Sequence, residues 1–147
     1  MGSQEQHPPT IGRLADPALH DLLERARAAA AQSYSPYSGF RVGAAIRLND
    51  GTIVTGTNVE NVSYGLTICA ERAAIVQAVS RFGPGIRIAA AAIANLNGQA
   101  SPPCGACRQF LAEFMLPDSS VVFPLAEGTR VTSFCDLMPF ACDLKLR

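Results

Sequence analysis

Two cysteine motifs constrain this chain more than any other feature. Cys69 opens the stretch CAERAAIVQ, and the later stretch PCGAC carries Cys104 and Cys107. Each motif stands at the start of a helical pattern, where backbone N–H groups and the helix dipole stabilise thiolates. Three cysteines at two helix starts predict a fold in which both starts meet at one metal ion.

The rest of the pattern alternates between helices and strands. Asp16 before Pro17 is an N-cap signal, residues 49–51 (Asn-Asp-Gly) are a hairpin signal, and Gly128 marks a later turn. This order predicts an α/β fold in which helices cover a mixed sheet. The expected helices span 17–32, 69–82 and 104–115, and the expected strands span 41–48, 52–59, 86–95 and 120–124, before a poorly defined tail.

Length and composition indicate one globular domain. The 147 residues suffice for one hydrophobic core, and we expect residues 16–147 to form a single domain after a disordered polar lead, 1–15. The lead lacks the apolar core of a signal peptide, which predicts a cytoplasmic protein. Five cysteines is an odd number, so without an export signal we expect free thiols or metal ligands.

Charge and hydropathy argue against two classes of partner. Lys plus Arg equals Asp plus Glu at 12 each, and no basic run occurs, so we expect no nucleic-acid partner. The longest apolar stretch, IRIAAAAIAN, contains an arginine and is too short for a membrane span. A small molecule is the expected partner, and the 48% hydrophobic content favours an oligomer.

The motif residues fit a catalytic zinc site, which has three protein ligands and an open position for water. Glu71 stands two residues after Cys69, where a carboxyl can take a proton from zinc-bound water and pass it to a leaving amine. Three thiolates leave such a cluster negative, and we expect Arg72 and Arg108 to offset that charge. Zinc deaminases of nucleobases combine these elements, with Cys-x-Glu or His-x-Glu followed by Pro-Cys-x-x-Cys.

Longer stretches extend the match. Besides both motifs, the chain contains YSPYSGFRVGAA and TNVENVSYGLTICAER. With these blocks, which lie between about residues 34 and 114, the chain resembles the cytidine deaminase family and specifically its short, homotetrameric, three-cysteine branch. The resemblance implies a three-layer α/β/α fold with a five-stranded mixed sheet flanked by helices. It also implies one zinc ion per chain, held by the three motif cysteines.

The same resemblance implies a reaction, the hydrolytic deamination of cytidine or deoxycytidine to uridine or deoxyuridine plus ammonia, in pyrimidine salvage. A zinc-bound hydroxide would attack C4 of the base, with Glu71 as the proton shuttle. Phe40 and Ala70 would lie at the substrate, and Asn58 and Glu60 would bind the ribose hydroxyls. A homotetramer is implied as well, because neighbouring subunits complete the active sites in this family.

The C-terminal tail departs from the family pattern. Family members usually close with Leu-Leu-Pro, two variable residues and a phenylalanine that packs on the base. Here the text is DLMPFACDLKLR, in which Phe140 follows Pro139 directly. Two alternatives therefore stay open: a deaminase of a modified cytosine nucleoside, such as the blasticidin type, and a non-catalytic, zinc-stabilised protein of the deaminase fold.

Other roles for the cysteines are also open. A redox pair in PCGAC leaves Cys69 and Glu71 without a role. A structural zinc site would need a fourth cysteine, Cys135 or Cys142, and would close the metal to water. Deamination within RNA or DNA uses the same zinc chemistry, but the neutral charge argues against it. The sequence does not distinguish ribose from deoxyribose substrates.

Overall fold

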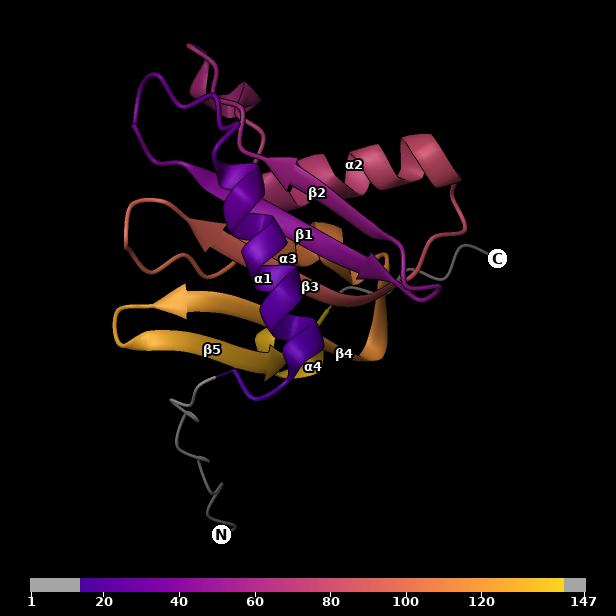
Figure 1. Cartoon of the computed structure of the whole chain (residues 1–147). Coiled ribbons are helices and arrows are strands. Elements are labelled where there is room, and N and C mark those ends of the chain that lie inside the picture. Colours follow the sequence, from indigo (N-terminus) through magenta and orange to yellow (C-terminus); the bar gives the residue numbers. More distant parts are fainter. Residues whose placement is uncertain (1–13, 142–147) are drawn as a thin grey trace, which may run out of the picture.

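The computed structural model describes residues 14–141, and their centre is a mixed five-stranded sheet (Figure 1). The strands are β1 (Val42–Leu48), β2 (Ile53–Thr57), β3 (Ile88–Asn95), β4 (Met115–Leu125) and β5 (Gly128–Ser133). They lie in the order β2-β1-β3-β4-β5. Every neighbouring pair is antiparallel except β3 and β4, which run parallel and are connected through a helix.

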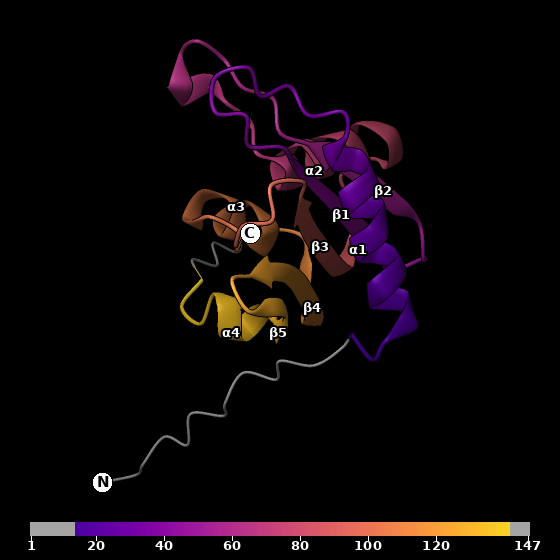
Figure 2. The same cartoon turned by 60° about the vertical axis from the view of Figure 1, so that its left-hand side comes forward.

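Helices cover both faces of the sheet, so the predicted three-layer α/β/α architecture is confirmed (Figures 1 and 2). The helix α1 (Pro17–Ala30) packs on one face, mainly over β1 and β3. The helices α2 (Ala70–Phe82), α3 (Gly105–Ala112) and the short α4 (Phe134–Leu137) lie on the other face. A 3-10 helix, η1 (Tyr64–Leu66), precedes α2.

Alternating side chains divide the core between the two faces. In β3, Ala90 and Ala92 pack with the residues of α1, whereas Ala91 and Ile93 pack with those of α2 and α3. Small residues suffice on the first face because α1 approaches closely: a Cβ on Gly43 would clash with the backbone of α1. The second face holds the larger aliphatic side chains. Full burial of each of them stabilises the folded state by about 1.5–3 kcal/mol.

The fold class agrees with the sequence-based expectation, but several element ends shift. The helix α1 ends at Ala30 rather than at residue 32, and α3 ends at Ala112 rather than at residue 115. The strand β4 begins well before the expected residue 120, because Met115 already pairs with Ile88. The region from Gly128 onward, predicted as a short element and a tail, forms β5 and α4.

Some sequence-based predictions concern parts of the chain outside the description. Most of the predicted disordered lead, 1–15, falls in residues 1–13, and Cys142 lies beyond Ala141, so neither is described. The boundary between lead and domain therefore stays a prediction. Within residues 14–141, no helix combines the length and the apolar character that crossing a membrane requires.

The sheet topology brings two loops together. Since β2 and β3 both pair antiparallel with β1, their carboxyl ends lie at the same end of the sheet. The chain after β2 leads to α2, and the chain after β3 leads to α3. Open α/β sheets bind ligands at the carboxyl ends of their strands, so both cysteine motifs are placed where a site is expected.

Candidate metal centre and active site

The two cysteine motifs lie at helix starts, as the sequence predicts. Cys69 is the N-cap residue of α2 and Cys104 that of α3, both with extended backbone geometry. The Sγ of Cys104 accepts a hydrogen bond from the backbone N–H of Cys107 at 3.5 Å, so it takes the place of an N-cap oxygen. The positive ends of both helices therefore favour negative charge on these sulfurs.

The fold brings the three predicted ligands together. The sulfur atoms of Cys69, Cys104 and Cys107 all lie within 4.8 Å of one another. Tetrahedral zinc with Zn–S bonds of about 2.3 Å needs sulfurs about 3.8 Å apart, so small side-chain movements suffice to bind the ion. Among residues 14–141, this is the only cluster of three or more His, Cys, Asp or Glu donors.

A fourth cysteine does not join this cluster in the described part of the chain. Cys135 lies on α4, where its exposed thiol donates to the Pro117 carbonyl at 3.3 Å. Within the cluster, Cys107 is buried but Cys104 is exposed, so the sulfurs are open to solvent on one side. Three ligands with an open side match a catalytic zinc site rather than a closed structural one.

Arg72 supports the sulfur of Cys69. Its Nη2 lies 3.6 Å from the Cys69 Sγ and donates to the Thr67 carbonyl at 3.2 Å. A hydrogen bond from Cys107 lowers the pKa of Cys69 to about 5, and the hydrogen bond and charge of Arg72 contribute to a smaller extent. The same Cys69–Cys107 contact and burial raise the pKa of Cys107. Negative charge therefore concentrates on the Cys69 sulfur, beside the guanidinium.

Glu71 is the buried acid of the site. Its side chain, in the first turn of α2, is only 5% exposed. Desolvation raises the pKa of Glu71 to about 6, and the charge on Cys69 acts in the same direction. A carboxyl with this pKa takes and gives a proton near neutral pH, which is the property that a general acid–base needs.

A cavity of about 300 Å³ adjoins the sulfurs and Glu71, a volume at the lower end of the usual range for small-molecule sites. It contains two of the metal ligands and three of the predicted substrate residues. Six further residues, three of them aliphatic, complete its wall, and the sequence did not predict them because no chemical motif marks them. The lining comprises Phe40, Val42, Asn58, Thr67, Cys69, Ala70, Glu71, Ile93, Ala100, Ser101, Pro102 and Cys104.

Asn58 fixes the wall of this cavity from the end of β2. Its side chain is 8% exposed. The Nδ2 group donates to the Phe40 carbonyl at 2.8 Å, and the Oδ1 atom accepts from the Val42 N–H at 2.9 Å and from the Ser33 hydroxyl at 2.5 Å. The amide therefore holds the segment that carries Phe40 against the sheet.

Glu60, the other predicted ribose contact, is absent from the cavity lining. Its carboxylate accepts hydrogen bonds from the backbone N–H groups of Tyr37 at 2.9 Å and Ser38 at 3.2 Å, and from the Ser38 hydroxyl. These bonds order the turn that leads to Phe40. The structure thus gives Glu60 an organising role in the loop beside the cavity.

Neither Arg108 nor Phe140 lines the cavity. The guanidinium of Arg108 donates to the backbone carbonyls of Pro103 and Leu137, and in the described residues it makes no hydrogen bond to a sulfur. Phe140 is 95% exposed and does not line the cavity. The expected charge compensation thus comes by direct contact from Arg72 alone.

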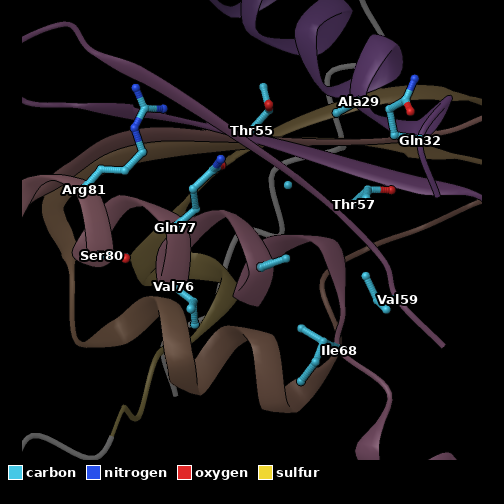
Figure 3. A pocket seen from close by; sticks show the side chains of 12 residues that line it. Ala29, Gln32, Thr55, Thr57, Val59, Ile68, Val76, Gln77, Ser80 and Arg81 are labelled. Atoms are coloured by element: carbon cyan, nitrogen blue, oxygen red, sulfur yellow. The ribbon is translucent and has the colours of Figure 1, made fainter. Parts of the chain in front are cut away.

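A second hollow, of about 880 Å³, lies along the edge strand β2, between α1 and α2 (Figure 3). Its lining contains no cysteine, histidine or carboxylate, and Arg81 is its only charged residue. Apolar side chains, including Val59, Ile68 and Val76, line it instead. This composition suits a contact surface and does not suit catalysis, so the smaller cavity is the candidate active site.

Comparisons with known proteins support the same assignment. The family described as the cytidine and deoxycytidylate deaminase zinc-binding region matches residues 17–123, which include all three cysteines of the cluster. A cytidine deaminase of Mycobacterium tuberculosis is 54% identical over 123 residues, or 84% of this chain and 88% of that protein. A cytidine deaminase of Halalkalibacterium halodurans is 44% identical over 121 residues, or 82% of this chain and 90% of that protein.

Solved structures agree with these sequences. The crystal structure of cytidine deaminase from Mycobacterium tuberculosis has a TM-score of 0.77 and 43% identity, covering 88% of this chain and 100% of that one. The crystal structure of cytidine deaminase from Burkholderia pseudomallei has a TM-score of 0.74 and 45% identity, covering 84% of this chain and 98% of that one. The matched zinc-binding region and the sulfur cluster together assign zinc to Cys69, Cys104 and Cys107.

Proposed function

The chain belongs to the family of deaminases that share the cytidine and deoxycytidylate deaminase zinc-binding region, and we propose that it converts cytidine or deoxycytidine and water into the uracil nucleoside and ammonia. One observation carries this proposal: the buried Glu71 carboxyl lines the same cavity as two of the three zinc-binding sulfurs. A buried acid next to a zinc centre that is open on one side is the arrangement that hydrolytic deamination needs.

In this proposal Glu71 moves every proton. Zinc, when bound, acidifies a water to a pKa of about 7 and so supplies the nucleophile for C4 of the base. The Glu71 carboxylate accepts the first proton of that water and donates it to N3 of the ring. It then carries the second proton from the attacking oxygen to the departing amino group. A pKa of about 6 suits Glu71 for transfer in both directions.

We assign nucleoside binding to the cavity wall and to the loop beside it. Phe40 and Ala70 contact the base, and Asn58 and Glu60 bind the ribose hydroxyls. This assignment is supported by the cavity position of Phe40, Asn58 and Ala70 and by the contact of Glu60 with the turn that leads to Phe40. The neutral net charge of the chain suits an uncharged nucleoside better than a polynucleotide.

The decisive experiment follows the ultraviolet spectrum of cytidine with zinc-loaded protein, beside the Glu71→Gln variant. The expected result is conversion to the uridine spectrum by the native protein and an activity lower by about 10²–10⁴-fold in the variant, which still binds zinc. Glu113→Gln is the matched control, because Glu113 is exposed at the C-terminal end of α3. Bound zinc without turnover of cytidine or deoxycytidine would refute the proposal and direct the search to modified cytosines or to a non-catalytic role.

We also propose that the chain assembles as a homotetramer whose neighbouring subunits help to close the active sites. Large apolar side chains remain exposed on the segment between β2 and α2 and on α2 itself: Val59 is 45% exposed, Ile68 39% and Val76 57%. These residues line the larger hollow (Figure 3), and a second copy of the chain is the occupant that we assign to it. Burying such side chains between copies would be favourable.

Light scattering tests this assembly. The expected mass is four times 15.5 kDa for the native chain, with a shift to smaller species in Val76→Glu, where a charge enters the proposed contact. Val131→Glu is the control, because Val131 is 41% exposed on the opposite edge strand, β5. A native monomer that is fully active at nanomolar concentration would contradict the shared active site.

A further inference from the structure

Arg108 joins two segments that are far apart in the chain. It lies on α3, directly after Cys107; its Nε donates to the Pro103 carbonyl at 2.8 Å and its Nη1 to the Leu137 carbonyl at 3.1 Å. Pro103 precedes the zinc ligand Cys104, and Leu137 is the last residue of α4. One guanidinium thus bridges the metal loop, residues 101–104, and the C-terminal segment, residues 134–141.

Arg108 donates hydrogen bonds to two backbone carbonyls of the metal loop, that of Cys104 and that of the residue before it. The backbone N–H of Arg108 donates to the Cys104 carbonyl at 2.9 Å, while its side chain holds the carbonyl of the preceding, fully buried Pro103. Cys104 itself is exposed, so backbone contacts hold it in place more than side-chain packing does. Groups that hydrogen-bond around a metal ligand set its orientation and the metal affinity.

The C-terminal segment depends on the same side chain. The short α4 leaves its last carbonyls without partners inside the helix. The Phe134 carbonyl accepts from the Met138 N–H at 2.9 Å, and the Leu137 carbonyl accepts from Arg108. Leu137 and Met138 pack partly buried against the main core. A hydrogen bond from a charged donor is roughly twice as strong as a neutral one, so Arg108 is a principal polar anchor of this segment.

We propose that Arg108 is a positioning residue that couples the C-terminal segment to the metal loop, so that docking of this segment sets how firmly Cys104 holds zinc. The effect on turnover rests on the proposed function, whereas the effect on zinc retention does not. Arg72 does not link the metal loop to the C-terminal segment, because its hydrogen bonds go to Cys69 and Thr67 at the start of α2.

Zinc release from the full-length, zinc-loaded protein into a colorimetric chelator tests the first half of the proposal. Zinc is expected to leave Arg108→Ala about 10- to 100-fold faster than the native protein, with Arg108→Lys in between because one of the two carbonyls keeps a donor. Arg87→Ala is the matched control and should be unchanged, since its guanidinium also donates to a backbone carbonyl, that of Ile86 at 2.7 Å. Native release rates in Arg108→Ala would overturn the proposal.

A double-mutant cycle tests the coupling itself. Leu137→Ala loosens α4 from the core but keeps the carbonyl, so it is expected to speed zinc release when Arg108 is present and to add nothing in Arg108→Ala. Additive effects would overturn the coupling. Hydrogen exchange followed by mass spectrometry should rise in both the metal loop and the C-terminal segment of Arg108→Lys, and a rise in only one of them would contradict the bridge.

These outcomes separate this inference from the proposed function. A native protein that holds zinc but does not deaminate cytidine would refute the function, while zinc release and hydrogen exchange would still decide the role of Arg108. Conversely, an active enzyme that releases zinc at the same rate with and without the Arg108 side chain would refute this inference and leave the proposed function intact.

Discussion

Gly56 of β2 lies directly against Ala70 of α2: a Cβ on Gly56 would stand 2.5 Å from the Ala70 carbonyl oxygen and 2.9 Å from the Cα of Ala74. Only glycine allows this approach between the strand and the helix. The contact fixes the first turns of α2, which carry Glu71 and follow the zinc ligand Cys69. The close packing of β2 against the backbone of α2 thereby positions Cys69 and Glu71.

The substitution Gly56→Ala should therefore affect stability and zinc together. An added methyl group that meets backbone on the opposite element costs about 1–3 kcal/mol of unfolding free energy, and displacement of α2 should also weaken zinc retention. Urea denaturation and zinc titration measure the two effects. Gly85→Ala is the control, because a Cβ there meets nothing within 4 Å; equal effects of the two substitutions would contradict the role of close packing.

Removal of one cysteine distinguishes an open zinc site from a closed one. Cys104→Ala should reduce bound zinc well below one ion per chain, lower the melting temperature of the zinc-treated protein and lower deaminase activity at least about 100-fold. Cys135→Ala should keep full zinc content, because Cys135 lies outside the sulfur cluster. Atomic emission measures the zinc content of both variants. Loss of zinc in Cys135→Ala would favour a closed site of four cysteines.

The metal centre was predictable from sequence because each part carries a local signal. Cys69 and Cys104 stand before helical patterns, and Glu71 follows at a fixed spacing. The mixed sheet was predictable for a similar reason, since its strands are apolar runs bounded by turn residues. Local periodicity defines an element without reference to the rest of the fold.

What the sequence did not predict depends on contacts between distant residues. The partners of Asn58 are Ser33, Phe40 and Val42, and no local pattern encodes such a network. The same holds for Arg108, whose guanidinium donates to the carbonyls of Pro103 and Leu137 and not to the sulfurs that it was expected to compensate. After Gly128 the sequence predicted only a short element and a poorly defined tail, because the partly exposed residues of β5 and α4 lack a clear apolar period.

The contact between Glu60 and Ser38 should depend on pH in a defined direction. Hydrogen bonds from the Ser38 hydroxyl, and then from the N–H groups of Tyr37 and Ser38, lower the pKa of Glu60 below its ordinary value of 4.5. A group whose pKa is lowered by folding keeps its contact above pH 4.5 and loses it only as the pH falls through the lower folded-state value. The amide resonances of Tyr37 and Ser38 should therefore titrate with a midpoint below 4.5.

Two variants test the origin of this titration. In Glu60→Gln the amide resonances of the turn should show no such transition, and in Ser38→Ala the midpoint should move back toward 4.5, because the largest cause of the shift is gone. A native midpoint above 4.5 would mean that Glu60 does not hold the turn in solution.

Arg72 should control zinc retention through the sulfur of Cys69. The Nη2 of Arg72 lies 3.6 Å from that sulfur, and a neutral glutamine at this position removes the positive charge that favours the thiolate. We expect zinc to leave Arg72→Gln about 10-fold faster or more, and the deaminase rate to fall with it. Arg87→Gln is the control, because its guanidinium donates to the Ile86 carbonyl and contacts none of the three sulfurs. Competition with a chelator measures the rate of zinc release from both variants. Equal rates would show that the charge beside Cys69 does not hold the metal.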